Sequence, residues 1–132
     1  MSLPLTPINP AGLAAPRGYS HGMRGTGTLL FVAGQIGWDG TGRLVSTGFV
    51  AQFAQALDNV LAVVREAGGE PARVARLTIY VTDKELYRSC LQEIGHAYRE
   101  RMGRHYPAMA LVEVRSLLEG GALVEIEATA VL

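Results

Sequence analysis

Glu125 and Glu127 have the residue type and spacing best suited to acid–base chemistry in this sequence. They lie in residues 123–131, where apolar and polar residues alternate. This alternation predicts a strand with both carboxylates on one face, about 7 Å apart at ~3.3 Å per residue. One carboxylate could then line a pocket and activate a water molecule while the other stays solvated. Two solvated glutamates on a sheet surface remain the simpler interpretation, and the residues alone favour it.

Other residue types that often take part in catalysis show weaker patterns. His21, His96 and His105 lack the spacing of a zinc motif, so we expect no metal site. Cys90 falls among apolar residues at helical spacing, which favours a place in the core over a role as nucleophile. The glycine clusters match no nucleotide-binding motif, and we therefore expect no cofactor. The basic residues Arg99, Arg101, Arg104 and His105 could form a phosphate site, but cations also complement the dipole at a helix C-terminus, and we favour that role.

The composition narrows the classes of partner. Among 132 residues, twelve Lys and Arg balance twelve Asp and Glu. A chain without net charge lacks the electrostatic footprint of a nucleic-acid or anionic-membrane binder, so a small molecule is the expected partner. A single cysteine excludes a disulfide framework and favours a reducing compartment, for which the cytoplasm is the default. No stretch has the length and apolar character of a signal peptide or a membrane span.

The first half of the chain predicts two strands and a helix. Gly25-Thr26-Gly27 separates Tyr19–Arg24 from the apolar run Thr28–Ala33, which suggests a hairpin whose second strand is buried on both faces. Apolar residues then recur at helical spacing from Val50 to Val64, with Ser46 or Thr47 as the expected N-cap. Residues 1–16, rich in Pro and Ala, are expected to be loosely held.

The second half predicts a strand, a helix and two further strands. The residues of 76–82 alternate in polarity, and an apolar stripe then indicates a helix from about Glu85 to Arg101. Strands Ala108–Arg115 and Ala122–Leu132 follow. The expected order is therefore β-β-α-β-α-β-β in a single α+β domain of residues 1–132. Two helices cover only one face of such a sheet, so we expect a closed oligomer to cover the other.

Five segments together resemble the RidA/YjgF family, also described as endoribonuclease L-PSP or translation-inhibitor-like proteins. They occur in the family's order from about Tyr19 to the C-terminus: Phe31-Val32-Ala33-Gly34-Gln35-Ile36, Gln55-Ala56-Leu57-Asp58-Asn59-Val60, Ala67-Gly68-Gly69, Tyr106-Pro107-Ala108 and Val124-Glu125-Ile126-Glu127-Ala128. The resemblance implies a chorismate-mutase-like α+β fold with two helices on one face of a mixed sheet. It also implies a homotrimer with a central barrel and three ligand clefts between neighbouring subunits.

In the deaminating branch of that family, reactive enamines and imines such as 2-aminoacrylate derivatives are hydrolysed to keto acids and ammonia. The resemblance implies that Glu125 is the carboxylate that positions or activates the attacking water. It further implies that Tyr19 is the tyrosine near the cleft and that the backbone at Gly34 approaches the ligand. The family's arginine, which grips the substrate carboxylate, follows a Pro-Ala pair.

This sequence departs from the family at that position, because Met109 stands where the arginine would be and is followed by Ala110. An uncharged thioether cannot form the bidentate hydrogen bonds of a guanidinium, so standard 2-aminoacrylate deamination is not expected. Arg17 is a candidate substitute in a loop that could border the cleft, although a solvated loop arginine is the simpler interpretation. Two hypotheses remain open: hydrolysis of an imine-like electrophile with a neutral head, and a non-catalytic metabolite-binding or sensing module. A ribonuclease or translation inhibitor is less favoured, because the net charge is zero.

Overall fold

The computed structural model describes residues 3–132, and its longest helix is α1 (Phe49–Glu66). Buried residues recur along α1 at intervals of three and four, which places them on one face of the helix: Phe49, Gln52, Phe53, Ala56, Leu57, Val60, Leu61 and Val64. The predicted helix is confirmed, but its N-cap is Gly48. Ser46 lies two residues earlier, and its Oγ accepts a hydrogen bond from the Gly48 amide at 2.9 Å.

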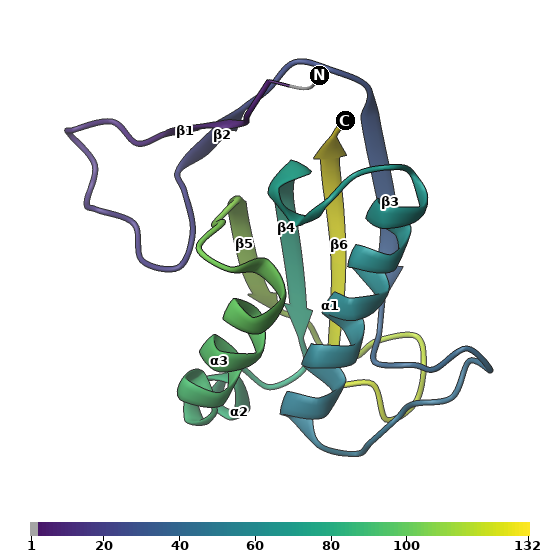
Figure 1. Ribbon diagram of the computed structural model, residues 1–132. Helices are drawn as coiled ribbons and strands as arrows, with labels where there is room; N and C mark the ends of the chain where they lie inside the picture. Colours follow the sequence, from purple (N-terminus) through teal and green to yellow (C-terminus); the bar gives the residue numbers. More distant parts are fainter. Residues whose placement is uncertain (1–2) are drawn as a thin grey trace.

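Four strands form the main sheet in the order β3-β6-β4-β5. The central pair, β4 (Val74–Val81) and β6 (Val124–Val131), is antiparallel, and β3 (Leu29–Gln35) pairs antiparallel with the outer side of β6. The other edge strand, β5 (Ala108–Glu113), runs parallel to β4. The sheet is therefore mixed, as expected, and Figure 1 shows its strands behind the helices.

The segment expected to form one helix from Glu85 to Arg101 forms two, α2 (Lys84–Ser89) and α3 (Leu91–Met102). Cys90 separates them with backbone angles outside the helical region, φ −114° and ψ 17°. The apolar spacing runs through this break, so periodicity alone did not indicate it. A one-turn 3-10 helix, η1 (Pro71–Arg73), leads into β4.

The expected hairpin between Tyr19–Arg24 and Thr28–Ala33 is wrong. β2 (Gly22–Arg24) pairs instead with β1 (Thr6–Ile8) in a separate two-stranded sheet. After the Gly25-Thr26-Gly27 turn, the chain pairs with the C-terminal strand. Thr28 and Leu132 exchange backbone hydrogen bonds of 2.9 and 2.8 Å. Local turn residues marked the change of direction, but they could not specify which strand would be the neighbour.

The N-terminal sixteen residues, expected to be loosely held, include β1. In addition, the carbonyl of Leu3 accepts a hydrogen bond from Arg73 Nη1, a side chain that also donates from Nε to the carbonyl of Val131. Residues 1 and 2 of this segment lie outside the described residues.

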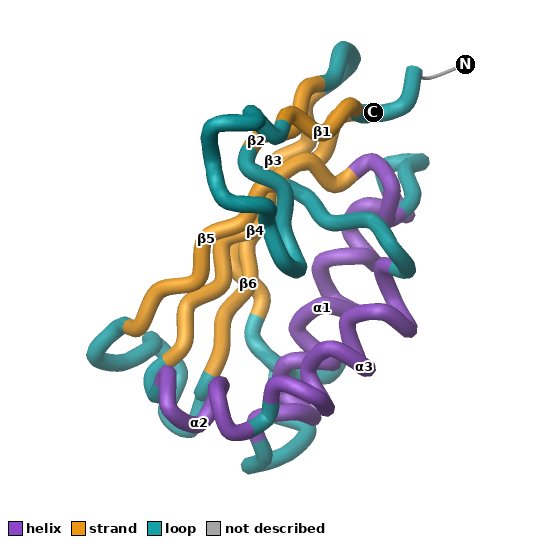
Figure 2. Tube along the Cα trace, turned by 90° about the vertical axis from the view of Figure 1, so that its left-hand side faces the viewer, coloured by secondary structure: helices purple, strands orange, loops and turns teal. Residues whose placement is uncertain are grey.

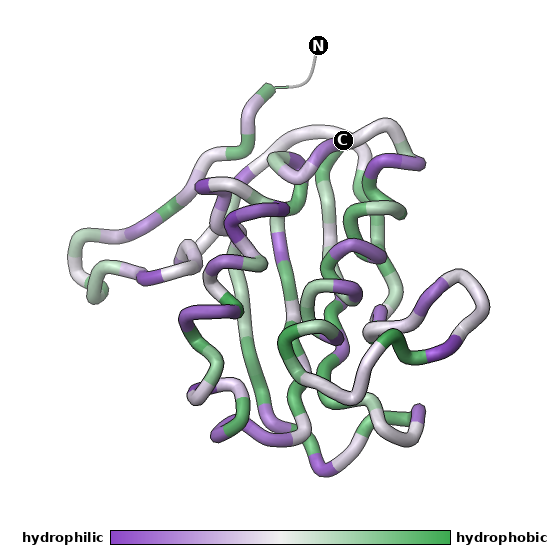
Figure 3. The backbone as a smooth tube through the Cα atoms, turned by 60° about the horizontal axis from the view of Figure 1, so that its bottom comes forward, coloured by the Kyte–Doolittle hydropathy of each residue, from purple (hydrophilic) through white to green (hydrophobic). Residues whose placement is uncertain are grey.

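Helices cover only one face of the main sheet. In Figure 2, α1 and α3 lie on the same side of the strands. Figure 3 shows apolar stretches along both the helices and the strands, and the hydrophobic core is built from buried residues of both layers. On the opposite face of β3, Phe31 is 73% exposed and Leu29 is 57% exposed in the single chain. The prediction that β3 is buried on both faces therefore does not hold within one chain. Two large apolar side chains remain for another surface to cover.

Candidate functional site

The carboxylate of Glu125 lies against the backbone of Gly34. These residues belong to the neighbouring strands β6 and β3, whose register shifts between Val32 and Gln35. A Cβ atom added to Gly34 would lie 2.7 Å from Glu125 Cδ and 3.1 Å from Oε1. Because any side chain at position 34 would meet the carboxylate, only glycine lets the carboxylate occupy this place.

Strand alternation confirms the predicted faces of β6. Val124, Ile126 and Ala128 are buried beneath the helices, whereas Glu125 and Glu127 are half-buried on the face that the helices leave uncovered. These two glutamates lie beside Tyr80 and Thr78 of β4, respectively. Both are therefore central in the sheet, where a covering surface would enclose them.

Glu127 has a partner of its own in Tyr80. The Tyr80 hydroxyl donates a hydrogen bond of 2.5 Å to Glu127 Oε1. This hydrogen bond is the largest cause of a rise in the pKa of Tyr80; burial and the charges of Glu127 and Glu125 add to it. Glu125 receives no comparable hydrogen bond from a side chain of residues 3–132, which leaves its carboxylate available to a ligand or a water molecule.

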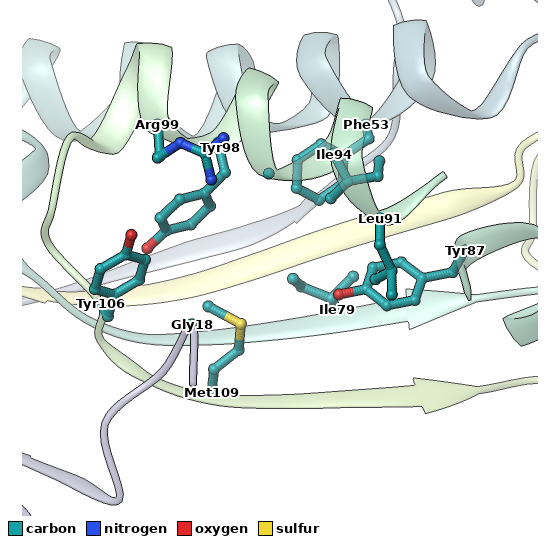
Figure 4. A pocket seen from close by; sticks show the side chains of 11 residues that line it. Gly18, Phe53, Ile79, Tyr87, Leu91, Ile94, Tyr98, Arg99, Tyr106 and Met109 are labelled. Carbon is teal, nitrogen blue, oxygen red and sulfur yellow. The ribbon is translucent and has the colours of Figure 1, made fainter. Parts of the chain in front are cut away.

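A cavity of about 260 Å³ lies on the other side of the sheet, between α3 and β5 (Figure 4). Met109 forms part of its wall, since the register of β5 beside β4 places Met109 next to Leu77, which is buried under the helices. Aromatic and apolar side chains from α2, α3 and the loop before β5 complete much of the lining. These residues include Tyr87, Leu91, Tyr98 and Tyr106.

Two tyrosines give this cavity a rigid aromatic wall. The rings of Tyr98 and Tyr106 are stacked, with centroids 5.5 Å apart and planes inclined by 7°. The Tyr98 hydroxyl donates a hydrogen bond of 2.6 Å to the carbonyl of His105. Burial raises the pKa of Tyr98, and the neighbouring Tyr106 contributes to the rise. Tyr98 is therefore a neutral hydrogen-bond donor here.

The remaining residues expected to bind a ligand lie around these two places. Arg17 is exposed and precedes Gly18, which lines the Met109 cavity. Tyr19 lines an adjacent cavity and makes an edge-to-face contact with His21, at 5.4 Å between ring centroids. Ala110 is half-buried on β5 beside Thr78, on the face that carries the glutamates.

The structure of one chain does not bring all these residues into one site. Glu125 and Gly34 lie together on the uncovered face of the sheet, whereas Met109 lies on the helix side, with β4 between β6 and β5. The side chains of Glu125 and Met109 therefore point to opposite faces of one sheet. A cleft that contains both must combine surfaces from two copies of the chain.

Arg99 and the tyrosines of the cavity were not selected as site residues from the sequence. Arg99 occupies the last turn of α3, as expected of a cation that complements the helix dipole, and it also lines the Met109 cavity. The helical period places residues 91, 94, 95, 98 and 99 along one side of α3. The helical period was therefore the available signal for these residues. It indicates which side chains share one side of α3, but it does not indicate a cavity beneath that side.

Within residues 3–132, no group of three His, Cys, Asp or Glu side chains is arranged to hold a metal ion. Over the same residues, no helix combines the length and the apolar character needed to cross a membrane.

Comparison with known proteins identifies the class to which this fold and these sequence segments belong. The model of the family described as Endoribonuclease L-PSP matches residues 10–132. RutC family protein y4sK of Sinorhizobium fredii is 35% identical over 126 residues, which are 95% of this chain and 94% of the relative. The human 2-iminobutanoate/2-iminopropanoate deaminase is 30% identical over 103 residues, 77% of this chain and 72% of that protein.

A solved structure agrees with this assignment. A protein of unknown function of the conserved Rid family, YyfB from Yersinia pestis, superposes with a TM-score of 0.83 at 34% identity, covering 98% of this chain and all of that chain. The chain belongs to the RidA/YjgF family, which confirms the resemblance seen in its five sequence segments.

Proposed function

We propose that this protein hydrolyses a small imine, enamine or related electrophile, with Glu125 as the catalytic residue, in a cleft formed between copies of the chain. The observation that carries this proposal is the contact of the Glu125 carboxylate with Gly34 on the uncovered sheet face. The glycine leaves room for the carboxylate itself, which is thereby held on the face where a second copy of the chain would cover it. The human relative named as an imine deaminase supports the reaction class.

In the proposed reaction, a water molecule attacks the carbon of the C=N bond. As the new C–O bond forms, the Glu125 carboxylate accepts a proton from this water, and the nitrogen takes up a proton from solvent to give a carbinolamine. Glu125 then returns its proton to the nitrogen, the C–N bond breaks and the hydroxyl loses its proton to solvent. The products are a carbonyl compound and ammonia, or an amine where the nitrogen is substituted. No cofactor is required by this chemistry.

The cleft is proposed to form in a homotrimer. Phe31 and Leu29 of β3 are exposed in the single chain, and α1 and α3 both lie on one side of the sheet. Covering a side chain the size of phenylalanine contributes roughly 1.5–3 kcal/mol. Packing three such faces against one another would bury these residues and would also bring Glu125 of one copy toward a neighbour.

Met109 sets the proposed reaction apart from standard 2-aminoacrylate deamination. Its uncharged side chain lines the cavity, at the sequence position where the resemblance implies an arginine. A missing charged hydrogen bond costs about 1.5–3 kcal/mol, or roughly tenfold to a hundredfold in affinity for a small carboxylate. We therefore expect slow turnover of the smallest imino acids. Arg17 remains a weaker candidate for a replacement, because the adjacent Gly18 lines the cavity and Arg17 itself does not.

A non-catalytic module that binds or senses a metabolite is the second candidate. The apolar wall formed by Met109, Leu91 and the two stacked tyrosines favours it, because such a wall can bind a ligand without any chemical step. An endoribonuclease or translation inhibitor has less support, since the chain has no net charge with which to attract a nucleic acid. The lone Cys90 fits the proposed cytoplasmic setting.

An assay of imine hydrolysis tests this proposal. Three imines can be generated in situ by amino-acid or amine oxidases: 2-iminobutanoate, the bulkier 2-imino-4-methylpentanoate and the uncharged 2-methylpropan-1-imine. Semicarbazide traps the free imine, so hydrolysis by the protein lowers the rate of semicarbazone formation. We expect turnover of at least one of the last two imines, little turnover of 2-iminobutanoate, and a loss of activity in Glu125→Gln.

Glu127→Gln provides the matched control, because it removes the neighbouring carboxylate on the same face of β6. Equal activity of Glu125→Gln and the unmodified protein would contradict the catalytic role of Glu125. If the protein hydrolyses none of the three imines, the non-catalytic binding module is favoured instead.

A further inference from the structure

Arg99 is the only charged residue among the residues of 3–132 that line the Met109 cavity. It projects from the last turn of α3, above the stacked pair Tyr98 and Tyr106, whereas Met109 lies across the cavity on β5 (Figure 4). The cavity therefore has a cation on its helix side and an apolar wall on its strand side.

The guanidinium of Arg99 lies over the backbone of its own helix, at a glycine. A Cβ added to Gly95 would lie 3.0 Å from Arg99 Nη1 and 3.7 Å from Cζ. These distances are close enough that a larger residue at position 95 would displace the guanidinium. Gly95 therefore lets the arginine fold back toward the cavity.

The charge of Arg99 is not taken up by a carboxylate of the described residues. Arg88 pairs with Glu85 at 2.8 Å, and Arg101 pairs with Asp58 at 2.7 Å. Glu100, next to Arg99, pairs with His96 at 2.6 Å and with Arg101 at 3.5 Å. Arg99 takes part in none of these ion pairs, so its donors are available to an anion that enters the cavity.

We propose that Arg99 binds the carboxylate of an organic acid whose apolar substituent packs against Met109 and the stacked tyrosines. A guanidinium offers the planar pair of donors that a carboxylate accepts, and the remaining wall is apolar. The cavity of about 260 Å³ lies below the 300–1,000 Å³ typical of drug-sized ligands, which matches a small metabolite. The ligand class is thus a small apolar imino acid or the corresponding keto acid.

This inference rests on the proposed function in taking the cleft beside Met109 as the ligand site. It changes the expectation drawn from Met109 alone, which was a ligand with a neutral head. The methionine removes the cation from β5, but Arg99 supplies one from α3. Because Met109 also adds an apolar wall, a branched apolar acid is favoured over the smallest imino acids.

Binding of two probes tests the inference without any turnover. The probes are 4-methyl-2-oxopentanoate and its uncharged methyl ester, and isothermal titration calorimetry gives their dissociation constants. Because Arg99 is exposed, its hydrogen bond to the carboxylate should contribute at the lower end of the range for charged hydrogen bonds. We therefore expect the acid to bind about tenfold more tightly than the ester at low salt. In Arg99→Gln the ratio should fall to about one, whereas Arg99→Lys should keep part of the preference.

Arg88→Gln is the matched control, because it removes one positive charge from an exposed arginine that does not line the cavity. Its preference for the acid should equal that of the unmodified protein. The inference is overturned if the ester binds as tightly as the acid, if the preference survives Arg99→Gln, if Arg88→Gln also loses it, or if neither probe binds. Glu125→Gln separates this inference from the proposed function. If this variant keeps both the preference for the acid and the imine turnover of the unmodified protein, the catalytic role of Glu125 is refuted and the Arg99 site stands.

Discussion

Gly34→Ala gives the sharpest perturbation of the proposed catalytic carboxylate. The new Cβ would lie 2.7 Å from Glu125 Cδ, whereas ordinary van der Waals contact begins at about 3.4 Å. The carboxylate must therefore move by roughly 0.7 Å, and a misplacement of about 1 Å can cost a hundredfold in rate. We expect the rate of imine hydrolysis to fall roughly tenfold to a hundredfold.

The same substitution should have little effect on folding. The atoms that Gly34→Ala displaces belong to the end of a flexible side chain, and φ of Gly34 is not positive. Replacing glycine by alanine also reduces the entropy of the unfolded chain, which offsets part of the repacking cost. The free energy of unfolding should therefore change by less than about 1 kcal/mol.

Two measurements separate the effect on catalysis from the effect on folding. Steady-state suppression of semicarbazone formation gives the rate of imine hydrolysis, and equilibrium unfolding in urea gives the free energy of unfolding. Gly22→Ala is the control, because its new Cβ would meet Ile8 Cβ at an ordinary 3.5 Å. We expect this variant to keep the rate of the unmodified protein. An unchanged rate in Gly34→Ala would refute the argument that the exact place of the Glu125 carboxylate governs the reaction.

Three further predictions test the cleft, the assembly and the cavity wall. Met109→Arg should raise turnover of 2-iminobutanoate at least tenfold by adding a charged donor on the β5 side of the cavity, where Met109 offers none, and adding Glu125→Gln should remove the gain; equal rates would contradict this role of position 109. Light scattering should give a mass three times 14.1 kDa for the unmodified protein and a smaller mass for Phe31→Asp, which places a charge on the apolar face of β3; a single-chain mass for the unmodified protein would exclude the trimer. Because burial holds the pKa of Tyr98 above its ordinary value of 10.0, folding favours the protonated form; its contribution to stability is present below pH 10 and is lost as the pH rises above 10. Urea unfolding should show a smaller loss of stability from pH 8 to pH 11 in Tyr98→Phe than in the unmodified protein, together with a cost of about 1 kcal/mol at pH 8 because the His105 carbonyl loses its donor. Equal losses in the two proteins would show that Tyr98 does not titrate in this way.

Regular periodicity made the core of the fold predictable. In β6, the alternation of Val124, Glu125 and Ile126 indicated which side chains the helices would cover, and the structure confirms it. The three-and-four spacing of α1 likewise gave its length and buried face. Both patterns record burial, because buried positions are mostly apolar; buried Gln52 of α1 is an exception, and its side chain donates hydrogen bonds to the carbonyls of Ser46 and Gly121.

Features that depend on distant parts of the chain were not predictable in the same way. Gly25-Thr26-Gly27 indicated a turn, but the partner of the following strand is β6, almost a hundred residues later in the chain. The break at Cys90 falls within a continuous apolar stripe. Arg99 matched a general rule for helix C-termini, so its place beside the Met109 cavity became visible only when α3 and β5 were packed together.

The central claim is that the reactive site combines Glu125 of one copy with the Met109 cavity of another. Within one chain, these two residues lie on opposite faces of the sheet. Glu125→Gln removes the carboxylate, and Met109→Trp fills the cavity with a larger side chain. Each variant alone should therefore be inactive on the imine that the unmodified protein hydrolyses.

Unfolding and refolding the two variants together at equal concentrations tests this claim most directly. If the site is shared between copies of a symmetric trimer, random mixing should restore about a quarter of the sites and hence about a quarter of the activity. If each site lies within a single chain, no mixed assembly contains an intact site, and the mixture should remain as inactive as its parts.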